Sequence, residues 1–214
     1  MEDKYGVSYS DDGKRLLRCS NKQIESYQIL DGTETIEDGA FMDCSTLLEL
    51  TIPDSVTSIG EGAFATCSSL KEVNIPNSVT SIGKGAFIQC FSLKEVNVPD
   101  SVTSIGELAF AECSALLKIT IPNSITSIGE NTFRKCSSLQ EVTIPNSVTS
   151  IGEHTFMECF SLKEVMIPNS VTAIAEGAFK KCTSLQEVTI PDRFRGEIDN
   201  IFDYPNLITI NYTN

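Results

Sequence analysis

The stretch LKEVNIPNSVTSIGKGAFIQCFS, from Leu70 to Ser92, sets the fold because most of the chain repeats it with small variations. Phenylalanine, cysteine and proline each recur along the chain at a constant step of 23 residues, for example from Phe64 to Phe87. The phenylalanines are Phe41, Phe64, Phe87, Phe110, Phe133, Phe156 and Phe179, and the cysteines are Cys44, Cys67, Cys90, Cys113, Cys136, Cys159 and Cys182. A fixed period of this size is typical of a solenoid, in which each repeat is one coil stacked on the next.

The first part of the repeat predicts a short β-strand. Leu70, Val73 and Ile75 are apolar, and β-branched residues dominate the stretch. Pro76 ends the strand because proline has no N–H to donate to a ladder of hydrogen bonds. The Asn-Ser pair that follows is typical of a turn. The polar residues between the apolar positions are predicted to face solvent.

The second part of the repeat leads back to the next strand. Gly83 is predicted to break the path, and KGAFIQC predicts about one turn of helix with Ala86, Phe87 and Cys90 inside. In other coils the residue after this glycine is usually glutamate, which suits the start of a helix. One repeat buries too few apolar side chains to offset the entropy of ordering it, so each coil must complete its neighbour's core.

Composition narrows the class of protein. The 214 residues are 41% hydrophobic and carry a formal net charge of -13. An acidic surface repels phosphate backbones, so we expect no nucleic-acid partner. No apolar run approaches the roughly 20 residues of a membrane-spanning helix, so we expect no membrane insertion. The opening MEDKYGVSYSDDG lacks the features of a secretory signal; either the protein stays inside the cell or a signal has been removed.

The unit LxxVxIPxSVTSIGxxAFxxCxS resembles the BspA-like leucine-rich repeat, a 23-residue class that also occurs in treponemal surface proteins. The resemblance runs from about Ile24 to Val188. It implies an α/β repeat solenoid, curved and right-handed, with a parallel β-sheet on its concave face and short helical turns or extended segments elsewhere. It also implies a surface-associated role in binding or adhesion.

A single domain is predicted over residues 1–214. Two strand-like runs around Asp11-Asp12-Gly13 predict a β-hairpin cap over 1–23. The repeats occupy 24–192, beginning with a half coil. Residues 193–214 are predicted to be a C-terminal cap with a degenerate repeat, in which Phe202 keeps the phase of Phe179 and the strand pattern returns one residue early.

Several recurring polar residues could carry chemistry. The cysteines follow the period of the fold and not the short spacing of a zinc site, so they predict a ladder of buried thiols, with a free Cys19 outside it. His154 is the only histidine, and its equivalents include glycine, leucine and asparagine, which indicates a solvated turn. The Asp/Asn file after proline predicts turns rather than calcium sites, and the threonine file predicts exposed strand positions rather than an ice-binding array. We therefore expect no enzyme, cofactor or metal.

The outward positions of the strands are the remaining candidate for a site. They carry lysine and glutamate with amides, hydroxyls and single apolar residues, a mixture that suits a protein or a glycan. The predicted partner-binding residues of the concave face are Lys71, Glu72, Asn74, Lys94, Glu95, Asn97, Leu117, Lys118, Thr120, Gln140, Glu141, Thr143, Lys163, Glu164 and Met166. A solvated sheet that binds nothing is the alternative, because repeated glutamates also keep sheets from associating.

These observations predict a non-enzymatic leucine-rich repeat binding module, a monomer at the cell surface or secreted. It would bind proteins of a host or neighbouring cell surface or matrix. The alternative is a structural or intracellular scaffold, located in the cytoplasm, with no dedicated ligand. A carbohydrate-binding module ranks third, because the outward files contain no aromatic residue.

Overall fold

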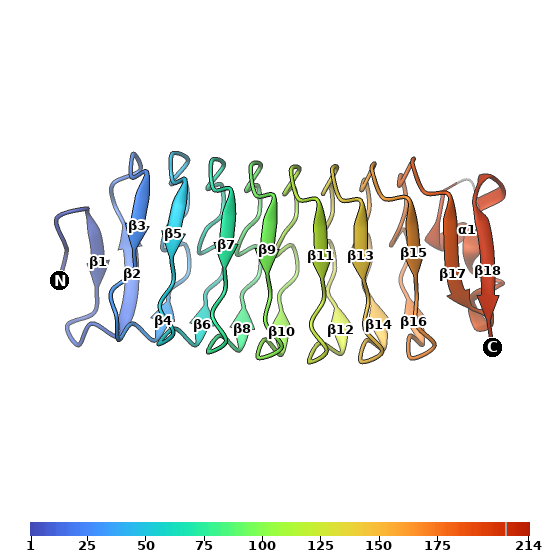
Figure 1. Ribbon diagram of the computed structural model, residues 1–214, viewed down its shortest axis with the longest axis horizontal. Helices are drawn as coiled ribbons and strands as arrows, with labels where there is room; N and C mark the ends of the chain where they lie inside the picture. Colours follow the sequence, from blue (N-terminus) through green and yellow to red (C-terminus); the bar gives the residue numbers. More distant parts are fainter. Residues whose placement is uncertain (204) are drawn as a thin grey trace.

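The computed structural model describes residues 1–203 and 205–214. Its coils stack in a single row, with the two termini at opposite ends (Figure 1). Each regular coil contributes one three-residue strand and one two-residue strand, called here the long and short strands. The long strands stand side by side along the row, and the short strands form a second file (Figure 1).

The strand bounds follow the period of the sequence. The long strands are β3 (Ser26–Gln28), β5 (Glu49–Thr51), β7 (Glu72–Asn74), β9 (Glu95–Asn97), β11 (Lys118–Thr120), β13 (Glu141–Thr143), β15 (Glu164–Met166), β17 (Glu187–Pro191) and β18 (Thr209–Thr213). The short strands are β4 (Thr35–Ile36), β6 (Ser58–Ile59), β8 (Ser81–Ile82), β10 (Ser104–Ile105), β12 (Ser127–Ile128), β14 (Ser150–Ile151) and β16 (Ala173–Ile174).

The long strands form the predicted parallel sheet, and the short strands form a second parallel file that the sequence did not predict. Val73 lies opposite Val96 in the long file, and Ile59 lies opposite Ile82 in the short file, each pair one period apart. The long file is hydrogen-bonded in separate groups, β3-β5, β7-β9, β11-β13 and β15-β17-β18. The chain is therefore a β-solenoid of stacked parallel strands. Its curvature and its hand stay predictions.

The predicted helical turns are wrong. In the described residues, the helices are η1 (Asp192–Phe194), α1 (Ile198–Ile201) and η2 (Pro205–Leu207), all beyond the regular coils. In the segment 84–90, Gly85 and Gln89 have φ of 56° and 59°, which a right-handed helix does not allow. The amides of Gly85, Phe87 and Gln89 donate instead to the carbonyls of Glu107, Ala109 and Ala111 in the next coil, at 2.8–2.9 Å.

The glycine file also has a different role from the one predicted. A Cβ added at Gly83 would lie 2.5 Å from the carbonyl carbon of Gly60 and 2.6 Å from the amide nitrogen of Glu61. Gly106 meets the backbone of Lys84 in the same way. Glycine is therefore required at Gly83 and Gly106, because the backbones of adjacent coils nearly touch there, whereas an added Cβ at Gly129 would lie 3.4 Å from its nearest neighbour and Ala175 holds the equivalent position in a later coil.

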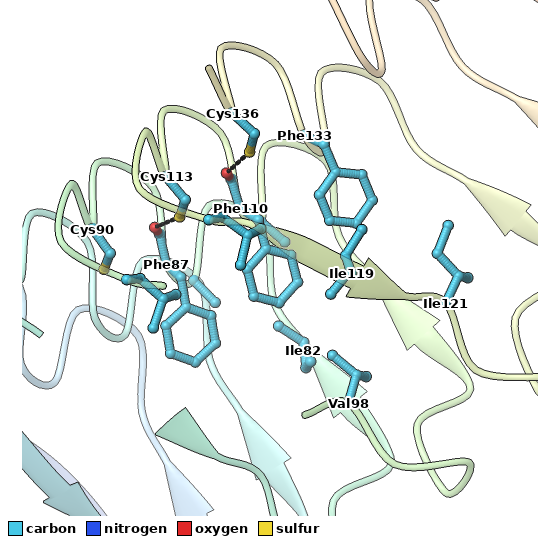
Figure 2. Packing of buried hydrophobic residues seen from close by; sticks show 14 of the residues in the cluster. Ile82, Phe87, Cys90, Val98, Phe110, Cys113, Ile119, Ile121, Phe133 and Cys136 are labelled. Atoms are coloured by element: carbon cyan, nitrogen blue, oxygen red, sulfur yellow. Dashed lines mark hydrogen bonds between the residues drawn. The ribbon is translucent and has the colours of Figure 1, made fainter. Parts of the chain in front are cut away.

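A column of phenylalanine rings forms the centre of the core. The rings from Phe41 to Phe202 stack with centroids 5.1–5.6 Å apart, and every ring is at most 1% exposed. Figure 2 shows Phe87, Phe110 and Phe133 in this column, with Ile82 and Ile119 among the aliphatic side chains of the same core. Because each ring packs on the rings of two other coils, the core is continuous along the row.

The N-terminal end of the row is closed by an antiparallel pair. Strands β1 (Val7–Tyr9) and β2 (Arg15–Cys19) form a hairpin, and β2 then pairs in parallel with β4. The hydroxyl of Tyr27 donates to Asp3 Oδ2 at 2.6 Å and lies 2.8 Å from the hydroxyl of Tyr9, which ties the hairpin to the first half coil.

The C-terminal segment continues the stack, but its residues differ from those of the repeat unit. Phe202 stacks on Phe179 at 5.4 Å, and Ile210 of β18 lies opposite Val188 of β17, one residue short of the regular step. Arg195 covers the ring of Tyr212 at 3.8 Å. One residue of the predicted cap over 193–214, residue 204, lies outside the described residues. The division into one domain with two caps stays a prediction.

Candidate binding surface

The fifteen predicted residues lie together on five adjacent long strands. They occupy β7, β9, β11, β13 and β15 and the residue just before each strand, and all fifteen are exposed. The residues between them, such as Val73 and Ile119, are 3% and 2% exposed and belong to the core. This alternation is the ordinary consequence of a strand with one buried side. The fifteen residues are called the strand face below.

Glutamates recur at the first position of the long strands, in a row that Lys118 interrupts. Glu72 lies directly opposite Glu95, and Glu164 lies opposite Glu187, on neighbouring strands. Neighbouring parallel strands are only about 4.8 Å apart, so these carboxylates repel each other. These pairs of glutamates therefore do not stabilise the sheet.

One ion pair crosses between two strands of the face. Lys118 Nζ lies 2.7 Å from Glu141 Oε1, with side chains that are 57% and 55% exposed. An ion pair so open to water contributes roughly 0–1 kcal/mol. Both groups therefore remain available to a partner at little cost in stability.

A hollow opens on the strand face between β9 and β11. Its volume is about 360 Å³, and its lining includes Glu95, Asn97, Leu117, Lys118 and Thr120, all predicted site residues. The hollow lies where the long file passes from one hydrogen-bonded group to the next. Leu117 is 42% exposed, so the hollow offers an apolar contact surrounded by both charges, an amide and a hydroxyl.

Sequence reasoning missed a second hollow, which lies beside the first two strands of the long file. It measures about 520 Å³, and Tyr5 and Leu30 line it together with side chains of β3 and β5. Tyr5 is 47% exposed and its ring stands edge-on to Tyr27 at 5.9 Å, while Lys4 Nζ lies 4.9 Å from the ring centroid. Because Tyr5 belongs to the hairpin and not to a repeat, periodicity could not place it beside these strands.

The cysteines form the predicted ladder. From Cys67 onward, each thiol donates to the carbonyl oxygen of the phenylalanine 26 residues earlier, at 3.2–3.3 Å. Figure 2 shows two of these bonds, from Cys113 to Phe87 and from Cys136 to Phe110. Burial raises the pKa of the Cys113 and Cys136 thiols well above the usual value and that of Cys182 to about 12.

Cys19, predicted to be a free thiol outside this ladder, is a free thiol that donates to the carbonyl oxygen of Asn21 at 3.3 Å and not to that of a phenylalanine. It is completely buried in the hairpin, and its thiol adjoins that of Cys44. Burial, followed by the neighbouring Cys19 thiol, raises the pKa of Cys44 to about 12.

The thiols are expected to be unreactive in the folded protein. At mildly alkaline pH a disulfide reagent such as DTNB should modify almost none of the eight free cysteines, because all eight are buried and out of the reagent's reach. In denaturant all eight should react. Cys182, which is 8% exposed, should react first on partial unfolding. Rapid modification of several thiols without unfolding would contradict the buried ladder.

The single histidine and the recurring threonines contact adjacent coils. His154 Nδ1 lies 3.3 Å from Glu153 Oε1, and the imidazole fills the space beside Gly177. The hydroxyl of Thr80 donates to the Thr57 carbonyl oxygen at 3.2 Å, and other threonines of the file repeat this bond. Within residues 1–203 and 205–214, no group of three or more His, Cys, Asp or Glu side chains is arranged to hold a metal ion. A helix of the length and apolarity needed to cross a membrane does not occur in the same residues.

Stacked parallel coils with an apolar column inside and an exposed strand face define a leucine-rich repeat solenoid. The BspA type leucine rich repeat model matches residues 18–134 and 104–214, in 6 copies. The chain therefore belongs to the BspA-type leucine-rich repeat family, which confirms the resemblance drawn from the repeat unit.

Solved structures agree with this assignment. The chain is similar to the leucine-rich repeat protein of T. pallidum, with 25% identity and a TM-score of 0.75 over 93% of this chain and 95% of that chain. It is similar to a leucine-rich cell surface protein of Faecalibacterium prausnitzii, with 28% identity and a TM-score of 0.54 over 90% of this chain and 61% of that chain. The pneumococcal vaccine antigen PcpA shares the fold at 19% identity and a TM-score of 0.50, over 88% of this chain and 66% of that chain. None of the curated protein sequences matches the chain.

Proposed function

We propose that this chain is a non-enzymatic protein-binding module that acts as a monomer at the cell surface or after secretion. Its strand face contacts a protein of a host or neighbouring cell surface or matrix, and mediates adhesion. The proposal rests chiefly on the hollow between β9 and β11, where predicted polar residues surround the exposed Leu117.

The charge pattern supports the same surface. Glutamates that lie opposite each other on neighbouring strands repel, and a partner with complementary charge would offset that repulsion. Similarity to a protein described as a cell surface protein supports the proposed location. Membership of a repeat family, rather than of an enzyme family, supports the non-enzymatic role.

The test compares the parent chain with a variant of the strand face. Lys94, Glu95, Lys118, Glu141 and Lys163 are changed together to serine, and both proteins are used to capture partners from cell-surface and matrix extract. We expect a protein that the parent retains and the variant loses, with at least about a tenfold drop in affinity once that partner is purified. All five side chains are exposed, so the variant should unfold at the temperature of the parent.

A matched control removes the same number of charges elsewhere. Lys135, Glu153, Glu158, Lys180 and Lys181 lie on the return segments, and their change to serine should leave capture intact. Equal loss in both variants would show that only net charge matters and would contradict a site on the strand face. Capture of nothing by the parent would favour the alternative, a scaffold without a dedicated ligand.

A further inference from the structure

A third hollow lies on the return segments of the first coils, away from the long strands. Its volume is about 590 Å³, and Met42, Ala65, Ile88 and Leu108 contribute its apolar lining. Met42 is 42% exposed although it stands next to the core. An open apolar groove with a flexible methionine at its edge is typical of surfaces that receive apolar side chains of a partner.

Small residues form the floor of the groove. Gly62 and Gly85 line it, whereas the equivalent positions in the next coils hold Leu108, which closes the lining, then Asn131 and His154, before glycine returns at Gly177. The five residues from Gly62 to His154 have nearly the same φ, between 53° and 59°. The backbone therefore accepts larger side chains at this position, and glycine is used in the first coils where it leaves the space open.

The rim of the groove is acidic. Asp38 and Glu61 line it and are exposed, and in the part of the chain that the structure describes neither takes part in a salt bridge. Lys84, the cation on this rim, lies 2.9 Å from Glu107, so the rim itself carries two carboxylates and one lysine. The rim thus keeps negative charge beside an apolar floor.

We propose that this groove binds a short segment of a partner protein in which large apolar side chains alternate with lysine or arginine. The apolar side chains would lie over Ala65 and Ile88, and the cations would meet Asp38 and Glu61. A second copy of the chain is not the occupant, because its net charge of -13 would repel the acidic rim. The groove is separate from the strand face, so a partner on one surface does not require a partner on the other.

The direct test uses a fluorescent amphipathic peptide of leucine and lysine as the probe, with fluorescence anisotropy as the readout. We expect saturable binding at physiological salt, and at least about tenfold weaker binding when serine replaces leucine or glutamate replaces lysine in the peptide. Binding that persists with the leucine-free peptide would be attraction to an acidic surface in general, and would overturn the proposal.

Two protein variants locate the binding. Gly62→Asn with Gly85→Asn fills the groove, and Asn131 shows that asparagine fits this turn at a φ of 55°. We expect an affinity loss of about tenfold with an unchanged melting temperature, because an apolar anchor can no longer be seated. Unchanged affinity in this variant would overturn the proposal.

Charge reversal provides the second, independent variant. Glu61→Lys should weaken binding by about tenfold at low salt, and by less as salt is added, because the attraction is screened. Glu153→Lys makes the same change in net charge at the equivalent position of a coil further along the row, and it should have little effect. Equal losses in the two variants would contradict a site in the groove.

Discussion

Replacing Phe110 by alanine is expected to lower the free energy of unfolding by about 3–5 kcal/mol. The ring is completely buried and stacks on Phe87 at 5.4 Å and on Phe133 at 5.6 Å (Figure 2). Its removal leaves a cavity inside the column and deprives two neighbouring coils of a contact. Denaturant unfolding followed by circular dichroism measures the change.

The adjacent phenylalanine outside the column supplies the control. Phe91 lies one residue after Cys90 and is 45% exposed, so Phe91→Ala should change the free energy of unfolding by less than about 0.5 kcal/mol. The same substitution is thus made at two places that differ in burial. Similar effects of the two substitutions would show that the Phe110 column does not form the core.

Replacing Gly83 by valine is expected to cost about 3 kcal/mol, near the upper end for overpacked sites. The new Cβ would lie within 2.5–2.7 Å of the backbone of Gly60 and Glu61. These are backbone atoms of the adjacent coil, so they cannot move aside without breaking the ladder to that coil. The melting temperature should fall, and hydrogen exchange should accelerate first in the two coils that are forced apart.

Gly196 offers a control, because it is a glycine with free space beside it. An added Cβ there meets nothing within 4 Å, so Gly196→Ala should leave the free energy of unfolding within about 0.5 kcal/mol of the parent. A Gly83→Val variant as stable as the parent would mean that adjacent coils can separate at the glycine file. The close approach of their backbones would then not be a requirement of the fold.

The two candidate surfaces differ in how they depend on the repeat. The strand face consists of outward positions that every repeat provides, so it is a long surface of similar chemistry. The groove depends on Gly62 and Gly85, positions that the next three coils fill with Leu108, Asn131 and His154, so it is local. A partner of the strand face could bind in several registers along the row, whereas a partner of the groove has one position.

The repeat, its strands and its core follow from the spacing of residues along the chain. A constant step requires one coil to lie on the next, and apolar residues that recur at that step must share one interior. The long strands and the phenylalanine and cysteine columns could therefore be predicted without coordinates, and the family was identified by the resemblance of the repeat unit. The exposure of the fifteen strand-face residues could also be predicted, because side chains alternate along a strand.

The contacts between coils, in contrast, became visible only in three dimensions. The segment 84–90 has a helical pattern in sequence. Its backbone amides donate hydrogen bonds to the next coil, and some of its residues have positive φ, so it forms a series of turns. The place of Tyr5 beside β3 and the contact of the Cys19 thiol with that of Cys44 depend on how the hairpin folds onto the first coil. Most hydrogen bonds across coils join backbone groups. Almost every residue type carries such groups, so the residue pattern does not reveal these bonds.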